Sequence, residues 1–123
     1  MISTLGLITA LFTKHLVVDF FMQPPYMYKN KGTYGHIGGV SPAATHGWAT
    51  LCIFYCWPGL LPWTGMLAIA EFFIHYHIDW AKMNINKRCG WTPVNSEYFW
   101  MLLGVDQFLH ALTYIWMVWM IVG

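Results

Sequence analysis

Three pairs of histidine and aspartate, with the two partners four residues apart, are the residues of this chain best suited to chemistry. They contain every aspartate of the sequence, and they are His15 with Asp19, His75 with Asp79, and Asp106 with His110. On a helix of about 3.6 residues per turn, partners four apart lie on one face. Neutral imidazole and carboxylate are ligands of Zn²⁺, Mn²⁺ and non-haem iron, so the spacing favours a metal site.

The stretch from Glu71 to Lys82 carries the densest set of such groups. Glu71, His75 and Asp79 follow one another at intervals of four, and Lys82 comes directly behind them within a long hydrophobic run. Placing an ionisable side chain at membrane depth costs roughly 2.5–3.5 kcal/mol on insertion scales. Only 9% of the residues are charged. We therefore expect the polar stripe on this helix to have a functional use.

The composition indicates a membrane protein. Hydrophobic residues make up 58% of the 123 residues, whereas soluble domains are about one quarter charged. The length predicts one domain. The formal net charge is only +1, and the sequence has no basic patch that would follow a phosphate backbone, which excludes nucleic acid as a partner.

Apolar runs separated by Pro, Gly and polar residues predict an all-α fold, a polytopic membrane four-helix bundle. The expected helices cover about residues 2–22, 42–57, 63–84 and 96–122. Pro24 and Pro25 end the first helix, because proline cannot continue it. Ser41 is predicted to cap the second helix and Ser96 the fourth. The second helix is then shorter than the ~20 residues that a membrane span needs.

The loop charges predict the orientation. Lys29 and Lys31 lie in the first connection, and Lys87 and Arg88 lie in the third. The positive-inside rule places these two basic loops in the cytoplasm and both termini outside. The expected location is the inner (plasma) membrane of a bacterial-type cell.

In that topology, polar groups from all four helices meet in the cytoplasmic half of the bundle. The predicted metal ligands are His15, Asp19, His46, His75, Asp79, Asp106 and His110. An outer ring that orients the ligands or binds substrate is predicted at Gln23, Glu71, Lys82 and Gln107. These groups suffice for one metal with supporting carboxylates or for a dinuclear site. Zinc is the first choice, with manganese or iron as alternatives.

Two other interpretations of the pattern stay open. A histidine and an aspartate four residues apart also form a buried hydrogen-bonded pair that only fixes helix packing. Chains of such pairs can instead relay protons or ions between helices. Haem is disfavoured because the aspartates would then have no role. His36, in a loop, and His77, on another helix face, are not expected to join the site.

The combined pattern resembles a known family. The resemblance rests on four motifs: His15-x-x-x-Asp19-Phe20-x-x-Gln23, His46 at the start of the second helix, His75-x-x-x-Asp79-Trp80-x-Lys82, and Asp106-Gln107-x-x-His110. Together they are similar to the small bacterial and phage integral membrane proteins of the family called domain of unknown function 3307. The resemblance covers nearly the whole chain. It implies the bundle and the choice of positions, and it supplies no activity.

From the residues we expect an intramembrane metal site, with metal-dependent hydrolysis or group transfer on a membrane-delivered substrate if the protein is an enzyme. The alternatives are a proton or metal-ion conduit and a non-catalytic membrane interaction protein with structural His–Asp pairs. The expected partner is the lipid bilayer, and a homo-oligomer is left open. A catalytic site should be closed toward the outer side, whereas a conduit needs polar groups continuing outward.

Overall fold

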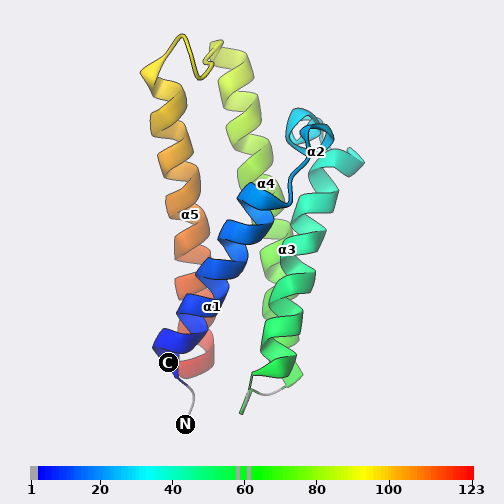
Figure 1. Cartoon of the computed structure of the whole chain (residues 1–123), viewed down its shortest axis with the longest axis vertical. Coiled ribbons are helices and arrows are strands. Elements are labelled where there is room, and N and C mark those ends of the chain that lie inside the picture. Colours follow the sequence, from blue (N-terminus) through cyan, green and yellow to red (C-terminus); the bar gives the residue numbers. More distant parts are fainter. Residues whose placement is uncertain (1–2, 58, 61) are drawn as a thin grey trace.

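The computed structural model describes residues 3–57, 59–60 and 62–123, and over these residues the chain is helical without any β-strand. Its long helices (Figure 1) are α1 (Thr4–Leu16) with the π-helical continuation η1 (Val17–Phe21), α3 (Ile37–Cys56), α4 (Gly65–Cys89) and α5 (Glu97–Val122). Two short elements, α2 (Pro25–Asn30) and the 3₁₀ turn η2 (Pro62–Thr64), lie in the connections. The all-α prediction is confirmed for the described residues.

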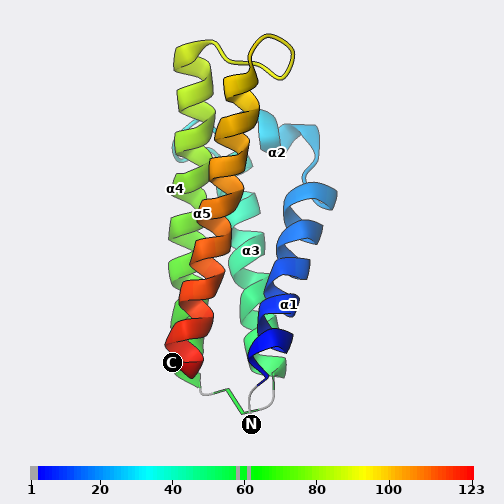
Figure 2. The same cartoon turned by 90° about the vertical axis from the view of Figure 1, so that its left-hand side faces the viewer.

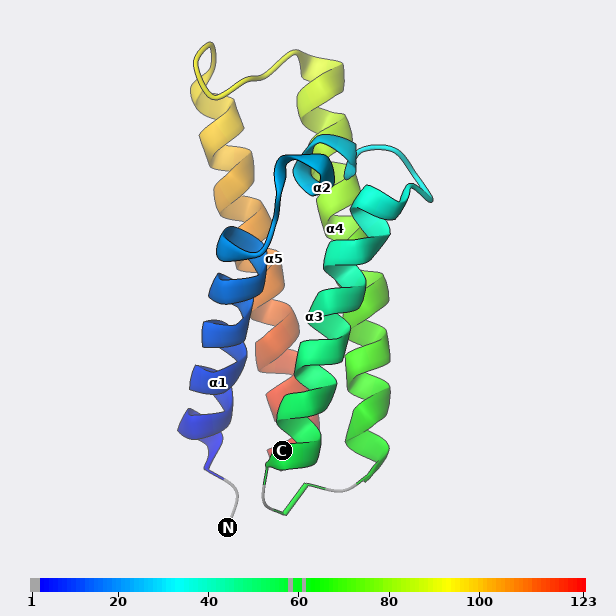
Figure 3. The ribbon, with the colours of Figure 1, turned by 45° about the vertical axis from the view of Figure 1, so that its right-hand side comes forward.

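The long helices lie side by side, as Figure 2 shows. Helix α4 packs against both α3 and α5, and α1 packs against α5 and α3. Both termini lie at one end of the molecule, and the connection between α4 and α5 lies at the other (Figure 3). Helix α2 packs on α3 beyond the end of η1. This arrangement turns one face of every long helix toward a shared interior.

The first helix changes from α-helical to π-helical geometry before it ends. Its predicted start at Ile2 lies outside the described residues. From Val17 the α-helix continues as a five-residue π-helix that ends at Phe21, close to the predicted end. The following residues were predicted as a loop, which is wrong for Pro25–Asn30. They form α2, because a proline at the first helical position has the required φ and lacks only an N–H that would have no partner.

The predicted start of the second helix is also wrong. Helix α3 begins at Ile37, not at Pro42, and its N-cap is His36, whose imidazole accepts a hydrogen bond from the Gly38 N–H at 2.9 Å. Pro42 lies inside the helix. The 20 residues of α3 correspond to about 30 Å at 1.5 Å per residue. This helix is therefore not short, and it has the length of a membrane span.

Helix α4 extends beyond the predicted end at residue 84 and stops at Cys89. Gly90 follows with φ 68°, a left-handed conformation that glycine adopts without steric cost, and it terminates the helix. The Trp91 N–H donates to the Asn86 carbonyl at 2.9 Å, which closes the last turn. The start of α5 agrees with the prediction, because the Ser96 hydroxyl accepts from the Tyr98 N–H at 3.2 Å.

Many large hydrophobic side chains lie on the surface of the bundle, and several ionisable side chains lie inside it. Large hydrophobic side chains are exposed along every long helix, including Leu5, Trp48, Ile69 and Phe108, each more than 60% exposed. Several ionisable side chains are buried, among them Glu71, Asp79 and Asp106. Two helical stretches, Thr4–Phe21 and Glu97–Val122, are long and apolar enough to cross a membrane by length and composition. An apolar core fills the bundle at the end that holds the termini, with Leu7, Leu11, Phe54, Leu67, Met117 and Val118.

Candidate metal centre

The interior face of each long helix carries one part of a single polar cluster. The helical spacing of four brings His15 and Asp19, His75 and Asp79, and Asp106 and His110 onto the inner faces of α1–η1, α4 and α5. Helix α3 contributes His46, which is fully buried. All seven predicted ligand residues meet in this one cluster.

The carboxylates form one layer of the cluster. The Asp79 carboxylate lies 3.0 Å from the His75 Nε2 atom and 3.4 Å from the His110 Nε2 atom. The Asp19 carboxylate lies 3.5 Å from the His46 Nε2 atom. The Asp106 carboxylate lies 3.4 Å from the same His110 nitrogen. Each aspartate thus faces an imidazole, and the pairs cross between helices.

The four imidazoles form the next layer. The rings of His46 and His75 are 3.9 Å apart between centroids, and those of His75 and His110 are stacked at 4.2 Å. The His15 ring lies beside this column, 5.0 Å from the His110 ring and 5.3 Å from the His46 ring. Imidazoles from four helices therefore share one small volume.

Several atoms of these two layers have no hydrogen-bond partner although they are buried. Among the described residues they include the Nε2 atoms of His46, His75 and His110 and the Oδ1 atoms of Asp79 and Asp106. Buried polar atoms without partners are rare, because each costs about 1–3 kcal/mol. Two ligands on a tetrahedral zinc with bonds of about 2.1 Å lie ~3.4 Å apart. Two contacts between these atoms match that separation, because His110 Nε2 lies 3.4 Å from Asp79 Oδ1 and 3.4 Å from Asp106 Oδ1.

Two groups of side chains in the cluster can hold a metal ion. One is His75, Asp79 and His110, all buried, and the other is His15, His46 and His75. In each group one ligand atom per residue lies within 4.8 Å of the others. The first group has contacts of 3.0 and 3.4 Å and mixes nitrogen with oxygen, which suits a borderline ion such as Zn²⁺. His75 belongs to both groups and lies at the centre of the cluster.

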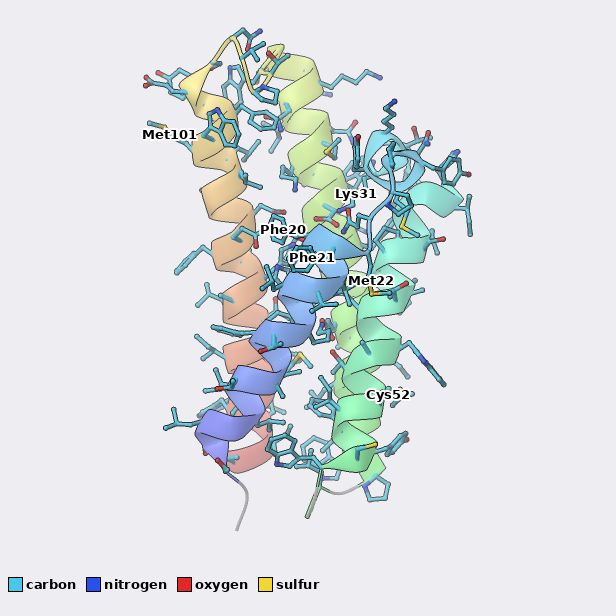
Figure 4. The ribbon with its side chains drawn as sticks, viewed as in Figure 1. Phe20, Phe21, Met22, Lys31, Cys52 and Met101 are labelled. Atoms are coloured by element: carbon cyan, nitrogen blue, oxygen red, sulfur yellow. The ribbon has the colours of Figure 1, made fainter. Side chains whose placement is uncertain are left out.

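Two lysines cover the carboxylate layer. The Lys82 Nζ lies 3.3 Å from Asp106 and 3.9 Å from Asp79, as expected for the predicted outer ring. The Lys31 Nζ lies 2.9 Å from Asp79 and 3.8 Å from Asp19. The sequence analysis placed Lys31 in a basic loop and did not predict its role here, whereas the structure buries it at 5% exposure. Figure 4 shows it beside α4, above the end of η1.

A separate ion pair, between Lys14 and Glu71, lies beside the imidazole layer. The Lys14 Nζ donates to Glu71 Oε1 at 2.5 Å and to the Tyr114 hydroxyl at 2.8 Å, and it lies 3.1 Å from His46 Nδ1. Thr50 donates to the other oxygen of Glu71. Sequence reasoning found Glu71 but missed Lys14, Thr50 and Tyr114. The sequence did contain an indication of Lys14, because it is a lone lysine beside His15 within an apolar helix.

The two predicted glutamines join the cluster at its edges. Gln23 donates to Asp19 at 2.7 Å. Gln107 connects two layers, because its carbonyl lies 3.0 Å from His15 Nε2 and its amide donates to Asp106 at 2.9 Å. His36 and His77 lie outside the cluster, where His36 caps α3 and His77 contacts Tyr34 at 3.1 Å.

The π-helix η1 carries Asp19, so the regular α-helix changes where the cluster needs a ligand. Single-turn π-helices occur mainly inside α-helices and are frequent at functional sites.

The charges in the carboxylate layer nearly balance. When the imidazoles are neutral, as binding of a metal requires, three aspartates and two lysines leave a net charge of minus one, while Lys14 and Glu71 cancel each other.

A comparison with family models matches residues 7–123 to the family described as "Protein of unknown function (DUF3307)". A search of the curated proteins found no match. A search of the solved structures found none either. The match covers every residue of the cluster.

Proposed function

The chain belongs to the DUF3307 family, and we propose that it is a multi-pass membrane protein that binds a divalent transition metal through the His/Asp cluster in its interior. The membrane half of the proposal is supported by the burial of Glu71, His75 and Asp106 and by the exposure of large apolar side chains on the surface. In a bilayer, ionisable side chains face the bundle interior and pair with one another. The two stretches with the length and composition of a span, Thr4–Phe21 and Glu97–Val122, support it further.

Helices α3 and α4 complete the proposed four-span bundle. They are 20 and 25 residues long, enough to cross a bilayer. Helix α4 is less apolar because it carries Glu71, Asp79 and Lys82, all turned toward the interior. With Lys31 buried, the orientation depends on Lys29, Lys87 and Arg88, which still favour cytoplasmic basic loops and external termini in a bacterial-type inner membrane.

One observation carries the metal half of the proposal. His75, Asp79 and His110 each offer a ligand atom within 4.8 Å of the others, and the unpartnered Asp79 Oδ1 and His110 Nε2 atoms lie 3.4 Å apart, a separation typical of two ligands of one ion. A cation between them would satisfy them together. Zinc is the first choice, and manganese or iron would also suit these nitrogen and oxygen ligands.

If the protein is an enzyme, the metal would polarise a substrate oxygen and activate water for hydrolysis or group transfer. The charge balance agrees with an anionic substrate. A divalent cation would change the charge of the carboxylate layer from minus one to plus one, and Lys31 and Lys82 would lie beside it. The substrate would reach such a site from the membrane.

Metal content of the detergent-purified protein tests the proposal. We expect near-stoichiometric metal in the wild type and loss of most of it in His75→Ala. The matched control is His77→Ala, which removes an imidazole two residues away on α4 that contacts Tyr34 and not the cluster. Folded wild-type protein that takes up no zinc, manganese or iron under supplementation would refute the metal centre.

A proton relay is the second candidate, and the column of imidazoles favours it. The adjacent rings of His46, His75 and His110, with centroids 3.9 and 4.2 Å apart, connect the carboxylate layer to the Lys14–Glu71 pair. Toward the termini, however, the column meets the apolar core described above, which argues against a continuous path. Proton flux into liposomes that contain the protein, lost in His46→Ala, would favour this alternative.

A further inference from the structure

A cavity of about 260 Å³ lies between α1–η1 and α5 and extends to the polar cluster. Its mouth is formed by Phe12, Leu16 and Phe20, which are 42–54% exposed. Figure 4 shows Phe20 between η1 and α5. The mouth is therefore apolar and open to the surface of the bundle.

The inner end of the cavity is polar. His15, Gln107 and Tyr114 line it, and Tyr114 is only 2% exposed. The Tyr114 hydroxyl lies 3.1 Å from His15 Nδ1, and the Gln107 carbonyl lies 3.0 Å from His15 Nε2. The cavity therefore leads from the surface to the His15 ring, whose centroid lies 5.0 Å from that of the His110 ring in the candidate metal centre.

The position of the mouth indicates what enters the cavity. The two elements on either side of it are the stretches with the length and composition of membrane spans. In a bilayer the mouth would therefore face lipid chains. Binding sites for whole small molecules usually measure about 300–1,000 Å³. A smaller cavity, open to lipid, fits the polar end and first methylene groups of a molecule whose remaining chain stays in the membrane.

We propose that this cavity binds a single-chain amphiphile, with its anionic head group at His15 and Gln107 and its chain leaving the protein between Phe12, Leu16 and Phe20. The head-group charge rests on the proposed function, because the bound metal makes the carboxylate layer positive. The apolar exit between the two helices rests on the cavity alone. The proposal assigns a phosphate or carboxylate head group as the substrate class of the metal centre.

Photo-crosslinking of the full-length protein in liposomes tests this. The probe is dodecyl phosphate with a diazirine on its chain, compared with the matching dodecanol. We expect the phosphate probe to label α1 and α5, and dodecanol to label them weakly. Ala111 lines the cavity, and Ala111→Trp should fill it and lower labelling by roughly tenfold, a loss of about 1.4 kcal/mol in binding.

Leu16→Trp is the second variant, because Leu16 is 48% exposed at the mouth and a larger side chain there covers the opening without entering the core. The control is Leu112→Trp on the outer face of α5, which should label like the wild type. Labelling that persists in both cavity variants, or dodecanol labelling as strong as that of the phosphate, overturns the proposal. Metal content, measured on the same samples, distinguishes failure of the metal centre from failure of the amphiphile site. Protein without metal refutes the metal centre. Protein that holds metal, but whose labelling is unchanged in both cavity variants, refutes only the amphiphile site.

Discussion

The buried pair of Lys14 and Glu71 allows a quantitative prediction. In Lys14→Met, a side chain of similar length replaces the lysine, and Glu71 keeps its charge but loses a partner 2.5 Å away. Glu71 is 1% exposed, so water cannot replace the lost contact. Breaking a buried ion pair on one side typically costs about 3–5 kcal/mol. The Tyr114 hydroxyl and His46 each lose a contact of the same ammonium group as well.

We therefore expect Lys14→Met to lower the free energy of unfolding by about 3–5 kcal/mol. At ~4 °C per kcal/mol for a chain of this length, Tm falls by roughly 12–20 °C. Circular dichroism in detergent measures this shift. The exposed Lys29→Met is the matched control and should change stability by less than about 0.5 kcal/mol.

A double-mutant cycle decides whether the cause is the unpaired charge. In Lys14→Met/Glu71→Gln no charge is left buried, and the new amide can still accept the hydrogen bond that Thr50 donates to Glu71. The double variant should therefore be more stable than Lys14→Met alone, with a coupling of about 1–3 kcal/mol. If the losses of the two single variants simply add, the pair is not an energetic unit and the reasoning is refuted.

Three further predictions concern the centre, the topology and a helix end. His75→Leu/Asp79→Leu should stay folded but lose the metal, because both members of the pair become apolar while Lys31 keeps Asp19 and Lys82 keeps Asp106 as a partner; a stable double variant that retains metal would contradict the central role of α4. In a background without native cysteines, Lys29→Cys should react with a membrane-impermeant maleimide only from the cytoplasm and Pro62→Cys only from outside, and the reverse pattern would invert the orientation. Gly90→Ala should cost about 1–2 kcal/mol in thermal unfolding because φ is 68° there, and an unchanged Tm would contradict that backbone strain.

Local rules accounted for the parts of the fold that depend on neighbouring residues. The spacing of four placed His75 with Asp79 and Asp106 with His110 on single faces, because the helical pitch fixes that relation without any tertiary contact. Ser96 capped α5 as predicted, since a cap needs only a side chain and an N–H two or three residues on. The start of α3 was wrong because Gly38 and Gly39 favour a loop in isolation, whereas the structure places them in the first turn of the helix.

The amino-acid sequence by itself determined that the chain is helical and that imidazoles and carboxylates share the inner helix faces. The spacing on α4 also placed Lys82 beside Asp79, whereas only the tertiary structure decided which other cations meet these groups. Lys31 reaches Asp79 because α2 packs on α3 and brings the following residue over the carboxylate layer. Lys14 reaches Glu71 because α1 packs across α3 and α5, which sets the direction that its side chain faces. Both contacts join residues about 50 or more positions apart, and such distances depend on how whole helices pack rather than on any local spacing.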